Sequence, residues 1–265
     1  MPDGSPVRDP QTLARIRSLA IPPAYTDVRI AVDPQSHIQA TGRDARGRKQ
    51  YRYHPDWTDV RAETKYATLV AFGRALPALR QRIDTALRRR SLDRERVVGS
   101  LVWLLDNTLV RVGNAAYARD NKSFGLTTLR SRHVTDDGRK LLLRFKGKSG
   151  KQWSLPLHDR RIMRVIRAVQ ELPGQSLFQY LDEDGTCHEV RSQEVNDYIR
   201  EAAGADFSSK HFRTWAATVA AASELREVGL PQTKRETAQT LNAVIDRVAK
   251  RLGNTRSVCR NSYIH

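Results

Sequence analysis

The end of the chain carries the residues with the clearest chemical potential. Tyr263 lies near the last position, in a basic segment spanning residues 252–263. Further upstream, residues 210–215 read Lys-His-Phe-Arg-Thr-Trp and add Lys210 and Arg213. Neighbouring cations favour the ionised form of a phenol, and a phenolate is a competent nucleophile toward phosphorus. This pattern predicts that Tyr263 attacks a phosphate.

The overall charge indicates what carries that phosphate. The chain has 265 residues, with 46 Lys and Arg against 29 Asp and Glu, for a formal net charge of +17. Such an excess favours a polyanionic partner, of which nucleic acid is the commonest; a membrane surface is the weaker alternative. The length allows one large domain or two.

Several classes of protein are disfavoured. No apolar run is long enough to span a membrane, and the N-terminus lacks a signal peptide, so we expect a cytoplasmic protein. Cys187 and Cys259 lie far apart and indicate neither a disulfide framework nor a zinc site. The seven histidines lack partners at ligand spacing, which argues against a catalytic metal. A glycine-rich phosphate loop is also missing.

The first part of the chain predicts a small β-containing domain. Asp9-Pro10 is a helix start, with Asp as N-cap and Pro at the first helical position, and the helix should run to Leu19. Residues 27–32 and 37–41 alternate as strands do, with a turn between them. The character becomes helical after about residue 54, so we place a domain boundary at residues 58–61.

Residues 42–53 form the most basic block of this domain. Arg and Lys can neutralise phosphates, Gln can bond base edges, and tyrosines two apart share one face of a strand. A solvated loop is the alternative, since most charge runs are solvated. We favour DNA contact by this block, through Arg46, Arg48, Lys49, Gln50, Tyr51 and Tyr53.

The elements that follow must position the remaining candidates. Apolar residues at helical spacing predict one helix that includes Leu76 and a second that begins after the N-cap Asp93. The second helix should end near Arg111. Arg111 is therefore either a cation at a helix end or a phosphate ligand. A three-stranded antiparallel unit is predicted over residues 126–134, 140–145 and 152–156. Its second turn carries Lys148, which is either an exposed turn residue or an ammonium that reaches a substrate.

The remainder of the chain is predicted to be helical. Helices should begin at Asp159, Ser192, Ser208 and Thr233, and a short final helix should carry Tyr263. The fold class is therefore α+β, with a small β-containing N-terminal lobe and a mainly helical catalytic domain that includes a three-stranded antiparallel sheet.

Taken together, these residues resemble the active-site set of the type IB DNA topoisomerases, specifically the small poxvirus-like enzymes found also in bacteria. The resemblance covers nearly the whole chain. It is carried by six ordered blocks: residues 42–53, Arg111-Val112-Gly113 with Tyr117, residues 123–129, Phe145-Lys146-Gly147-Lys148, residues 210–215 and residues 257–263.

The resemblance implies a role for each residue and a shared catalytic fold with the tyrosine recombinases. Tyr263 would attack a phosphodiester of double-stranded DNA, form a 3′-phosphotyrosyl link and release a 5′-hydroxyl strand. Arg111 and Arg213 would grip the non-bridging oxygens, and Lys148 would protonate the leaving oxygen. Contacts around the phosphate would come from Lys210, Gly113 and Tyr117.

The chemistry is consistent with these roles. Preorganised guanidiniums suit the charge that develops on phosphate oxygens, and two of them can replace a metal. Covalent capture preserves the bond energy, so resealing needs no ATP and no cofactor. The resemblance implies relaxation of supercoils by a monomer acting at the nucleoid, with a DNA-clamp domain over residues 1–58 and a catalytic domain over residues 59–265.

This chain departs from the family's pattern in two ways, and two alternative functions remain. Asn254 stands where many members have histidine; its amide can donate a hydrogen bond but carries no charge. By family comparison both ends of the chain are expected to be truncated. The rivals are a tyrosine site-specific recombinase and a catalytically impaired DNA-binding module; the block at residues 42–53 and Lys210-x-x-Arg213 favour the topoisomerase.

Overall fold

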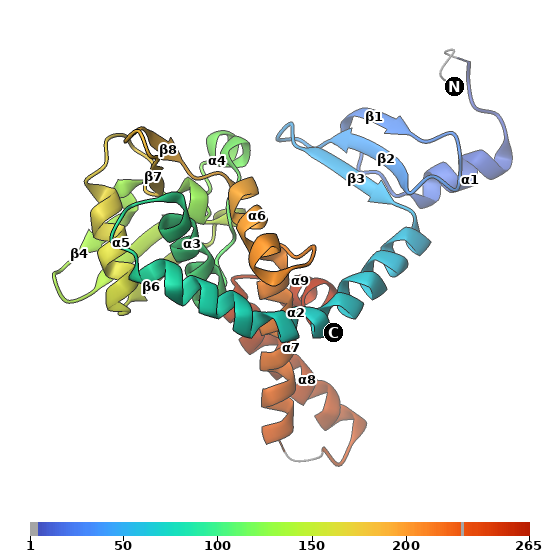
Figure 1. Cartoon of the computed structure of the whole chain (residues 1–265). Coiled ribbons are helices and arrows are strands. Elements are labelled where there is room, and N and C mark those ends of the chain that lie inside the picture. The colour runs from blue at the N-terminus through green and yellow to red at the C-terminus, as the bar shows by residue number, and fades with distance from the viewer. Residues whose placement is uncertain (1–4, 229–230) are drawn as a thin grey trace. The chain divides into compact units, whose positions relative to one another are not determined.

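The computed structural model describes residues 5–228 and 231–265, without the side chains of residues 58–59 and 61–64. The chain separates into two compact units, Met1–Thr68 and Leu69–His265 (Figure 1). Helix α2, Pro55–Arg88, belongs partly to each unit. The expected division at residues 58–59 falls inside this helix, and the assignment of a separate function to each domain stays a prediction.

The first unit is a helix fastened to a sheet. Helix α1, Pro10–Ser18, begins as predicted, because the carboxylate of Asp9 accepts a hydrogen bond from the Thr12 amide at 2.7 Å. Arg15 on this helix donates to the buried Gln39 at 2.6 Å and to the Ala31 carbonyl at 2.7 Å. These bonds hold α1 on the sheet and satisfy a polar side chain inside it.

The sheet of the first unit has three antiparallel strands in sequence order: β1, Thr26–Ile30; β2, Ile38–Arg43; and β3, Lys49–Tyr53. The two strands predicted from alternation are confirmed. The third strand lies in the basic block, where the rings of Tyr51 and Tyr53 stack with centroids 6.1 Å apart. The two tyrosines therefore share one face, as their spacing predicts.

The second unit is built around helix α3, Arg94–Thr108, whose N-cap is Asp93. Its buried face packs with α2 and with helices α5, Arg160–Gln170, and α6, Ser192–Ala203. The stripe of α2 predicted from helical spacing is fully buried at Leu76, Leu79, Ile83 and Leu87. Helix α5 begins at the predicted cap, where Asp159 accepts a bond from the Arg161 amide at 2.8 Å.

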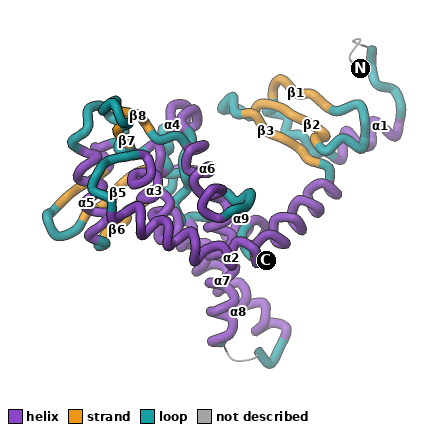
Figure 2. Tube along the Cα trace, viewed as in Figure 1, coloured by secondary structure: helices purple, strands orange, loops and turns teal. Residues whose placement is uncertain are grey.

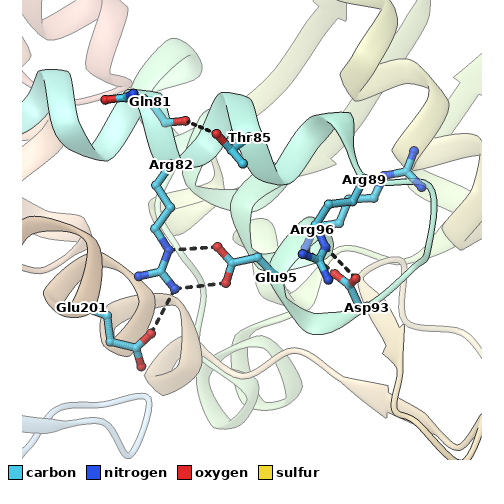
Figure 3. A network of polar contacts seen from close by, with 8 residues as sticks. All are labelled: Gln81, Arg82, Thr85, Arg89, Asp93, Glu95, Arg96 and Glu201. Carbon is cyan, nitrogen blue, oxygen red and sulfur yellow. Dashed lines mark hydrogen bonds and ion pairs between the residues drawn. The ribbon is translucent and has the colours of Figure 1, made fainter.

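A polar network on the surface of this core joins three helices (Figure 3). Arg82 of α2 donates to Glu95 of α3 at 2.8 Å and 3.0 Å, and to Glu201 of α6 at 3.2 Å. The guanidinium also lies 4.5 Å from the ring centroid of the buried Tyr198. These contacts raise the pKa of Arg82, chiefly through the Glu95 carboxylate, so the cation stays charged and holds α2 against α3 and α6.

An antiparallel sheet covers part of this core, with β4, Val134–Asp136; β5, Leu141–Lys146; and β6, Gln152–Leu157. The predicted three-stranded unit is thus present, but its first strand was predicted to start too early. Residues 126–133 instead form two short 3-10 turns, Leu126–Thr128 and Ser131–His133. The reason is that the Leu126 and Thr127 amides bond to the carbonyls of Arg111 and Val112 and not to β5.

Two short elements were not predicted. Helix α4, Ala115–Asn121, follows the segment of Arg111, and its N-cap Asn114 accepts a bond from the Tyr117 amide at 2.8 Å. A hairpin of β7, Gln179–Leu181, and β8, Cys187–Glu189, interrupts a region predicted to be wholly helical. Elements of three residues are too short to show a periodicity in sequence.

The last three helices pack together (Figure 2), and their buried side chains, with Leu109, form a second hydrophobic cluster. They are α7, Ser209–Glu227; α8, Lys234–Leu252; and α9, Arg256–Ser262. Helix α8 starts at the predicted capping box, in which Glu236 Oε2 accepts from the Thr233 backbone amide at 3.3 Å and Thr233 Oγ1 accepts from the Glu236 amide at 3.1 Å. Tyr263 ends α9 and packs against this cluster.

Candidate active site

Arg213 occupies the centre of the candidate site, on α7. Its side chain is only 4% exposed, and its two terminal nitrogens donate to the carbonyls of Leu109 and Leu252, the latter at 2.8 Å. Leu252 is the last residue of α8, and Leu109 caps α3 in the left-handed conformation. Helix C-termini carry partial negative charge, so these two ends stabilise a buried cation and fix its plane.

The phenol of Tyr263 lies against this guanidinium. Arg213 Cζ is 5.0 Å from the centroid of the Tyr263 ring, a cation–π contact. Burial raises the pKa of Tyr263, but the positive charges of Arg213 and Arg111 outweigh it, so the pKa lies below the usual value for a tyrosine. In return, burial and the repulsion of Arg111 lower the pKa of Arg213. The site thus favours the nucleophilic form of the phenol.

Arg111 reaches the site from the segment after α3. Its Nη2 atom donates to Asn254 Oδ1 at 2.7 Å, a contact between residues far apart in the sequence. Asn254 follows Gly253, the left-handed C-cap of α8, and its amide N–H bonds back to Ala249 at 2.9 Å. Helix α3 stops at Thr108, so Arg111 lies three residues beyond its last residue and bonds to Asn254; its role as a phosphate ligand stays a prediction.

Two buried donors of the site lack a partner within the described residues, Asn254 Nδ2 and Arg213 Nε. Because Arg111 occupies the oxygen of Asn254, the amide nitrogen is left as the donor. A buried donor without a partner is costly, on the order of 1–3 kcal/mol. Both atoms are suited to an acceptor-rich ligand such as a phosphate.

Glycines allow the Arg111 segment to approach its neighbour. Gly113 has φ +110°, and a Cβ there would come within 2.8 Å of Thr127 Oγ1. A Cβ on Gly125 would lie 2.5 Å from the Gly113 Cα. Side chains at either position would push the two segments apart, so both positions need glycine to hold the backbone of Arg111 in place. Tyr117, on α4, is half-buried, with its amide held by Asn114 as described above.

Lys148 stands on the turn between β5 and β6, in the short helix η3, Lys148–Gly150. The side chain is exposed, and no carboxylate in the described part of the chain forms an ion pair with it. The turn is anchored by Trp153: a Cβ on Gly147 would lie 2.7 Å from its indole Nε1, and one on Gly253 would lie 2.9 Å from its Cζ2. One indole therefore packs the lysine turn against the residue before Asn254.

The structure brings together four of the predicted residues, Arg111, Arg213, Asn254 and Tyr263, through the contacts above. Lys210 is exposed on the first turn of α7, and Gly113 supports the Arg111 segment. The sequence did not predict the contacts of Trp153 or the two carbonyls that hold Arg213. Only the left-handed cap at Gly253 had a signal, since glycine commonly ends a helix.

The basic block of the first unit is ordered by Asp44. Its carboxylate accepts bonds from the Arg48 side chain at 2.7 Å and from Gln50 Nε2 at 2.9 Å, and these contacts lower the pKa of Asp44 to about 2, with Arg48 as the largest cause. Lys49 Nζ lies 5.4 Å from the centroid of the Tyr51 ring. Arg46 is exposed. The block is thus a formed turn and strand that presents cations, with Arg48 and Gln50 partly engaged inside it.

No group of three or more His, Cys, Asp or Glu side chains that could hold a metal ion occurs in the described part of the chain. Within the same residues, none of the helices combines the length and apolarity required to cross a bilayer.

Comparison with known proteins identifies relatives of both units. A family model described as "Eukaryotic DNA topoisomerase I, catalytic core" matches residues 54–264, and one described as "Bacterial DNA topoisomerase IB, N-terminal domain" matches residues 1–44. DNA topoisomerase 1B of Acanthamoeba polyphaga mimivirus is 34% identical over 260 residues, covering 95% of this chain and 77% of the viral protein.

More distant viral proteins also match. DNA topoisomerase 1 of rabbit fibroma virus is 24% identical over 177 residues, which cover 63% of this chain and 55% of that protein. DNA topoisomerase I of monkeypox virus is 20% identical over 257 residues, covering 94% of this chain and 78% of that protein.

Proposed function

Because this chain belongs to the type IB DNA topoisomerases and is a DNA topoisomerase I enzyme, we propose that it relaxes supercoiled DNA through a covalent bond to Tyr263. The observation that carries the proposal is the packing of the Tyr263 ring on the buried Arg213 guanidinium, beside the Arg111–Asn254 pair. These contacts support the proposal because they gather a phenol, two cations and a neutral donor, whose chemistry suits a phosphodiester.

The cleavage step follows from this arrangement. Tyr263 attacks the phosphorus as the phenolate that Arg213 and Arg111 favour and forms a 3′-phosphotyrosyl bond, while the bond between phosphorus and the 5′-oxygen breaks. Lys148 donates the proton that the leaving 5′-oxygen takes up, and the DNA strand ends in a 5′-hydroxyl. The N–H groups of Arg111 and Arg213, with Asn254 Nδ2, stabilise the charge that develops on the non-bridging oxygens.

Resealing is the same step in reverse. The 5′-hydroxyl attacks the phosphotyrosyl bond, its proton returns to Lys148, and Tyr263 leaves as the phenolate that Arg111 and Arg213 stabilise. The bond energy is kept in the covalent intermediate, so we propose that the cycle runs without ATP. Two guanidiniums supply the charge that a metal would otherwise provide, so we also propose that it runs without a metal ion.

Binding of duplex DNA would involve both domains. The basic block, through Arg46, Lys49 and the stacked Tyr51 and Tyr53, would contact the backbone, and the contacts near the cleaved phosphate would include Lys210, Gly113 and Tyr117. The catalytic domain would have the fold shared with tyrosine recombinases. We propose that a monomer acts at the nucleoid and that torsional strain is released by rotation of the free strand end.

The proposal is tested by relaxation of a supercoiled plasmid in EDTA without ATP. Wild type should relax the plasmid and leave a covalent adduct on the 3′-phosphate when the reaction is stopped with detergent, whereas Tyr263→Phe should do neither while still binding DNA. Tyr180→Phe is the matched control and should retain activity. It also removes a phenol hydroxyl, but that hydroxyl donates to Glu194 at 3.2 Å and has no part in the proposed step.

The outcomes separate the alternatives. Relaxation by Tyr263→Phe would remove Tyr263 from the proposed role. Binding without any cleavage by wild type would favour a catalytically impaired DNA-binding module. Strand exchange that requires paired sites would favour a site-specific recombinase.

A further inference from the structure

The backbone on both sides of Tyr263 is bonded to one hydroxyl group. Thr218 Oγ1, on α7, donates to the carbonyl of Tyr263 at 3.2 Å and accepts from the amide of His265 at 3.2 Å. A threonine hydroxyl has one proton to donate and lone pairs to accept, so both bonds form at once. In helices this hydroxyl commonly bonds its own i−4 carbonyl, as Thr237 does on α8 at 2.9 Å.

The same short segment is held from its other side by the backbone of α9. The carbonyl of Cys259 accepts from the amides of Tyr263 at 3.0 Å and Ile264 at 3.2 Å, and the Cys259 side chain is fully buried. At Tyr263 the chain leaves the helix, with φ −135° and ψ −26°. The Thr218 hydroxyl adds a restraint from α7 to the one that α9 supplies, because it bonds both the Tyr263 carbonyl and the His265 amide.

Thr218 shares its helix with Arg213. The two residues are about 7.5 Å apart along the axis of α7, at about 1.5 Å per residue. One rigid element therefore holds both the guanidinium that faces the phenol ring and the hydroxyl that fixes the backbone from which the ring extends. The backbone that carries the ring is thus held by α7 as well as by α9.

We infer that Thr218 is a positioning residue for the cleavage reaction: its hydroxyl bridges the Tyr263 carbonyl and the His265 amide and sets the nucleophile at its attacking distance. This inference rests on the proposed function of Tyr263. Thr218 acts through the backbone and touches neither the phenol oxygen nor the DNA in this role. Nothing in the sequence marks it, because it lies outside the blocks that indicate catalysis.

The size of the effect follows from the geometry of in-line attack. A misplacement of about 1 Å at a reacting group can lower a rate by about a hundredfold. Thr218→Val keeps the shape of the side chain and removes both hydrogen bonds, so we expect single-turnover cleavage to slow by about 10- to 100-fold. DNA affinity should change little, since the hydroxyl is engaged within the protein.

The experiment measures single-turnover cleavage of a duplex at saturating enzyme, DNA affinity and thermal stability for three variants of the full chain. Thr218→Val removes the hydroxyl and Thr218→Ser retains it. Thr237→Val is the matched control, because that hydroxyl bonds only within its own helix. We expect Thr218→Val to cleave slowly, Thr218→Ser to recover to within a few-fold of wild type, and the control to cleave at the wild-type rate.

A purely structural role is distinguished by the pH dependence. If the ring leaves its place over Arg213, the pH midpoint of cleavage in Thr218→Val should move toward the value of about 10 of an unperturbed phenol. Unchanged cleavage by Thr218→Val overturns the inference. The inference is also overturned if the cleavage rate of Thr218→Val falls only in proportion to its thermal stability, with an unshifted pH midpoint. It is overturned as well if Thr218→Ser cleaves as slowly as Thr218→Val. Failure of wild type to form the covalent adduct instead overturns the proposed function.

Discussion

At the scale of single residues, burial and charge act on Tyr263 in opposite directions. Burial by itself would keep the phenol neutral, whereas Arg213 and Arg111 favour the phenolate and have the larger combined effect. Arg213 stays in its buried place because two helix-terminal carbonyls accept its hydrogen bonds. The reactivity of the nucleophile is therefore a balance that single substitutions can shift.

The first prediction concerns that balance. Arg111→Gln should raise the pKa of Tyr263, since it removes a positive charge while the burial that favours the neutral phenol remains. The pKa can be read as the difference between ultraviolet titrations of the protein that retains Tyr263 and of its Tyr263→Phe variant, each with and without Arg111→Gln. Arg88→Gln, at the exposed end of α2, is the control. An unchanged or lowered pKa in Arg111→Gln would contradict the assignment.

The second prediction concerns the shape of the Arg213 cation. Arg213→Lys keeps the charge, but a single ammonium cannot reproduce a planar fork held by the Leu109 and Leu252 carbonyls. We expect cleavage to slow by about 10²–10³-fold, the cost of losing one preorganised donor to a developing oxyanion. Single-turnover cleavage at saturating enzyme measures the loss. The control Arg88→Lys should cleave at the wild-type rate. If Arg213→Lys lowers the cleavage rate only a few-fold, Arg213 is not a main stabiliser of the developing charge.

At the scale of elements, close backbone contacts bring the site together. The segment of Arg111 pairs with residues 125–127, and the turn of Lys148 packs through Trp153 onto Gly253. Neither contact involves a functional side chain directly. They set the backbone positions of Arg111, Lys148 and Asn254.

The third prediction tests the Arg111 segment. Gly113→Ala would combine a positive φ with a Cβ within 2.8 Å of Thr127 Oγ1, whereas Gly138→Ala, with φ +83°, has no atom within 4 Å. We expect Gly113→Ala to lower the free energy of unfolding by about 1–3 kcal/mol more than the control, through overpacking. It should also slow cleavage, because the backbone of Arg111 is displaced. Denaturant unfolding of both variants checks the first point, and equal stabilities would contradict it.

At the scale of the whole molecule, charge decides the partner. The chain has a formal net charge of +17, and exposed cations occur among the described residues of both units. Binding to duplex DNA should release counterions from each neutralised phosphate. Affinity is thus expected to depend on the sum of many weak contacts more than on any one.

The fourth prediction concerns how these many phosphate contacts make DNA affinity depend on salt. The logarithm of the association constant for duplex DNA should fall linearly with the logarithm of salt concentration, and Arg46→Ala should reduce the slope by about one if it contacts a phosphate. Asp182→Asn, a charge change in the hairpin of β7 and β8, is the control and should leave the slope unchanged. An affinity that is flat with salt would argue against a phosphate-dominated interface.

The sequence by itself determined those features that local physics encodes. The caps at Asp9, Asp93, Asp159 and Thr233 predicted where helices begin, since a side-chain oxygen meets the free amides of the first turn wherever the rest of the chain lies. Alternation predicted the strands at residues 141–146 and 152–157 within a residue or so. The excess of basic residues and the ordered blocks predicted the family.

Only the tertiary structure decided how these parts act together. Residues 126–133 were predicted to belong to a strand but form turns, because the amides of Leu126 and Thr127 bond to the carbonyls of Arg111 and Val112, which no local pattern reveals. The same is true of the Asn254 contact to Arg111, the carbonyls that hold Arg213 and the Thr218 bridge. Each joins residues distant in sequence, and such contacts depend on how helices pack, which sequence periodicity indicates only as a buried face.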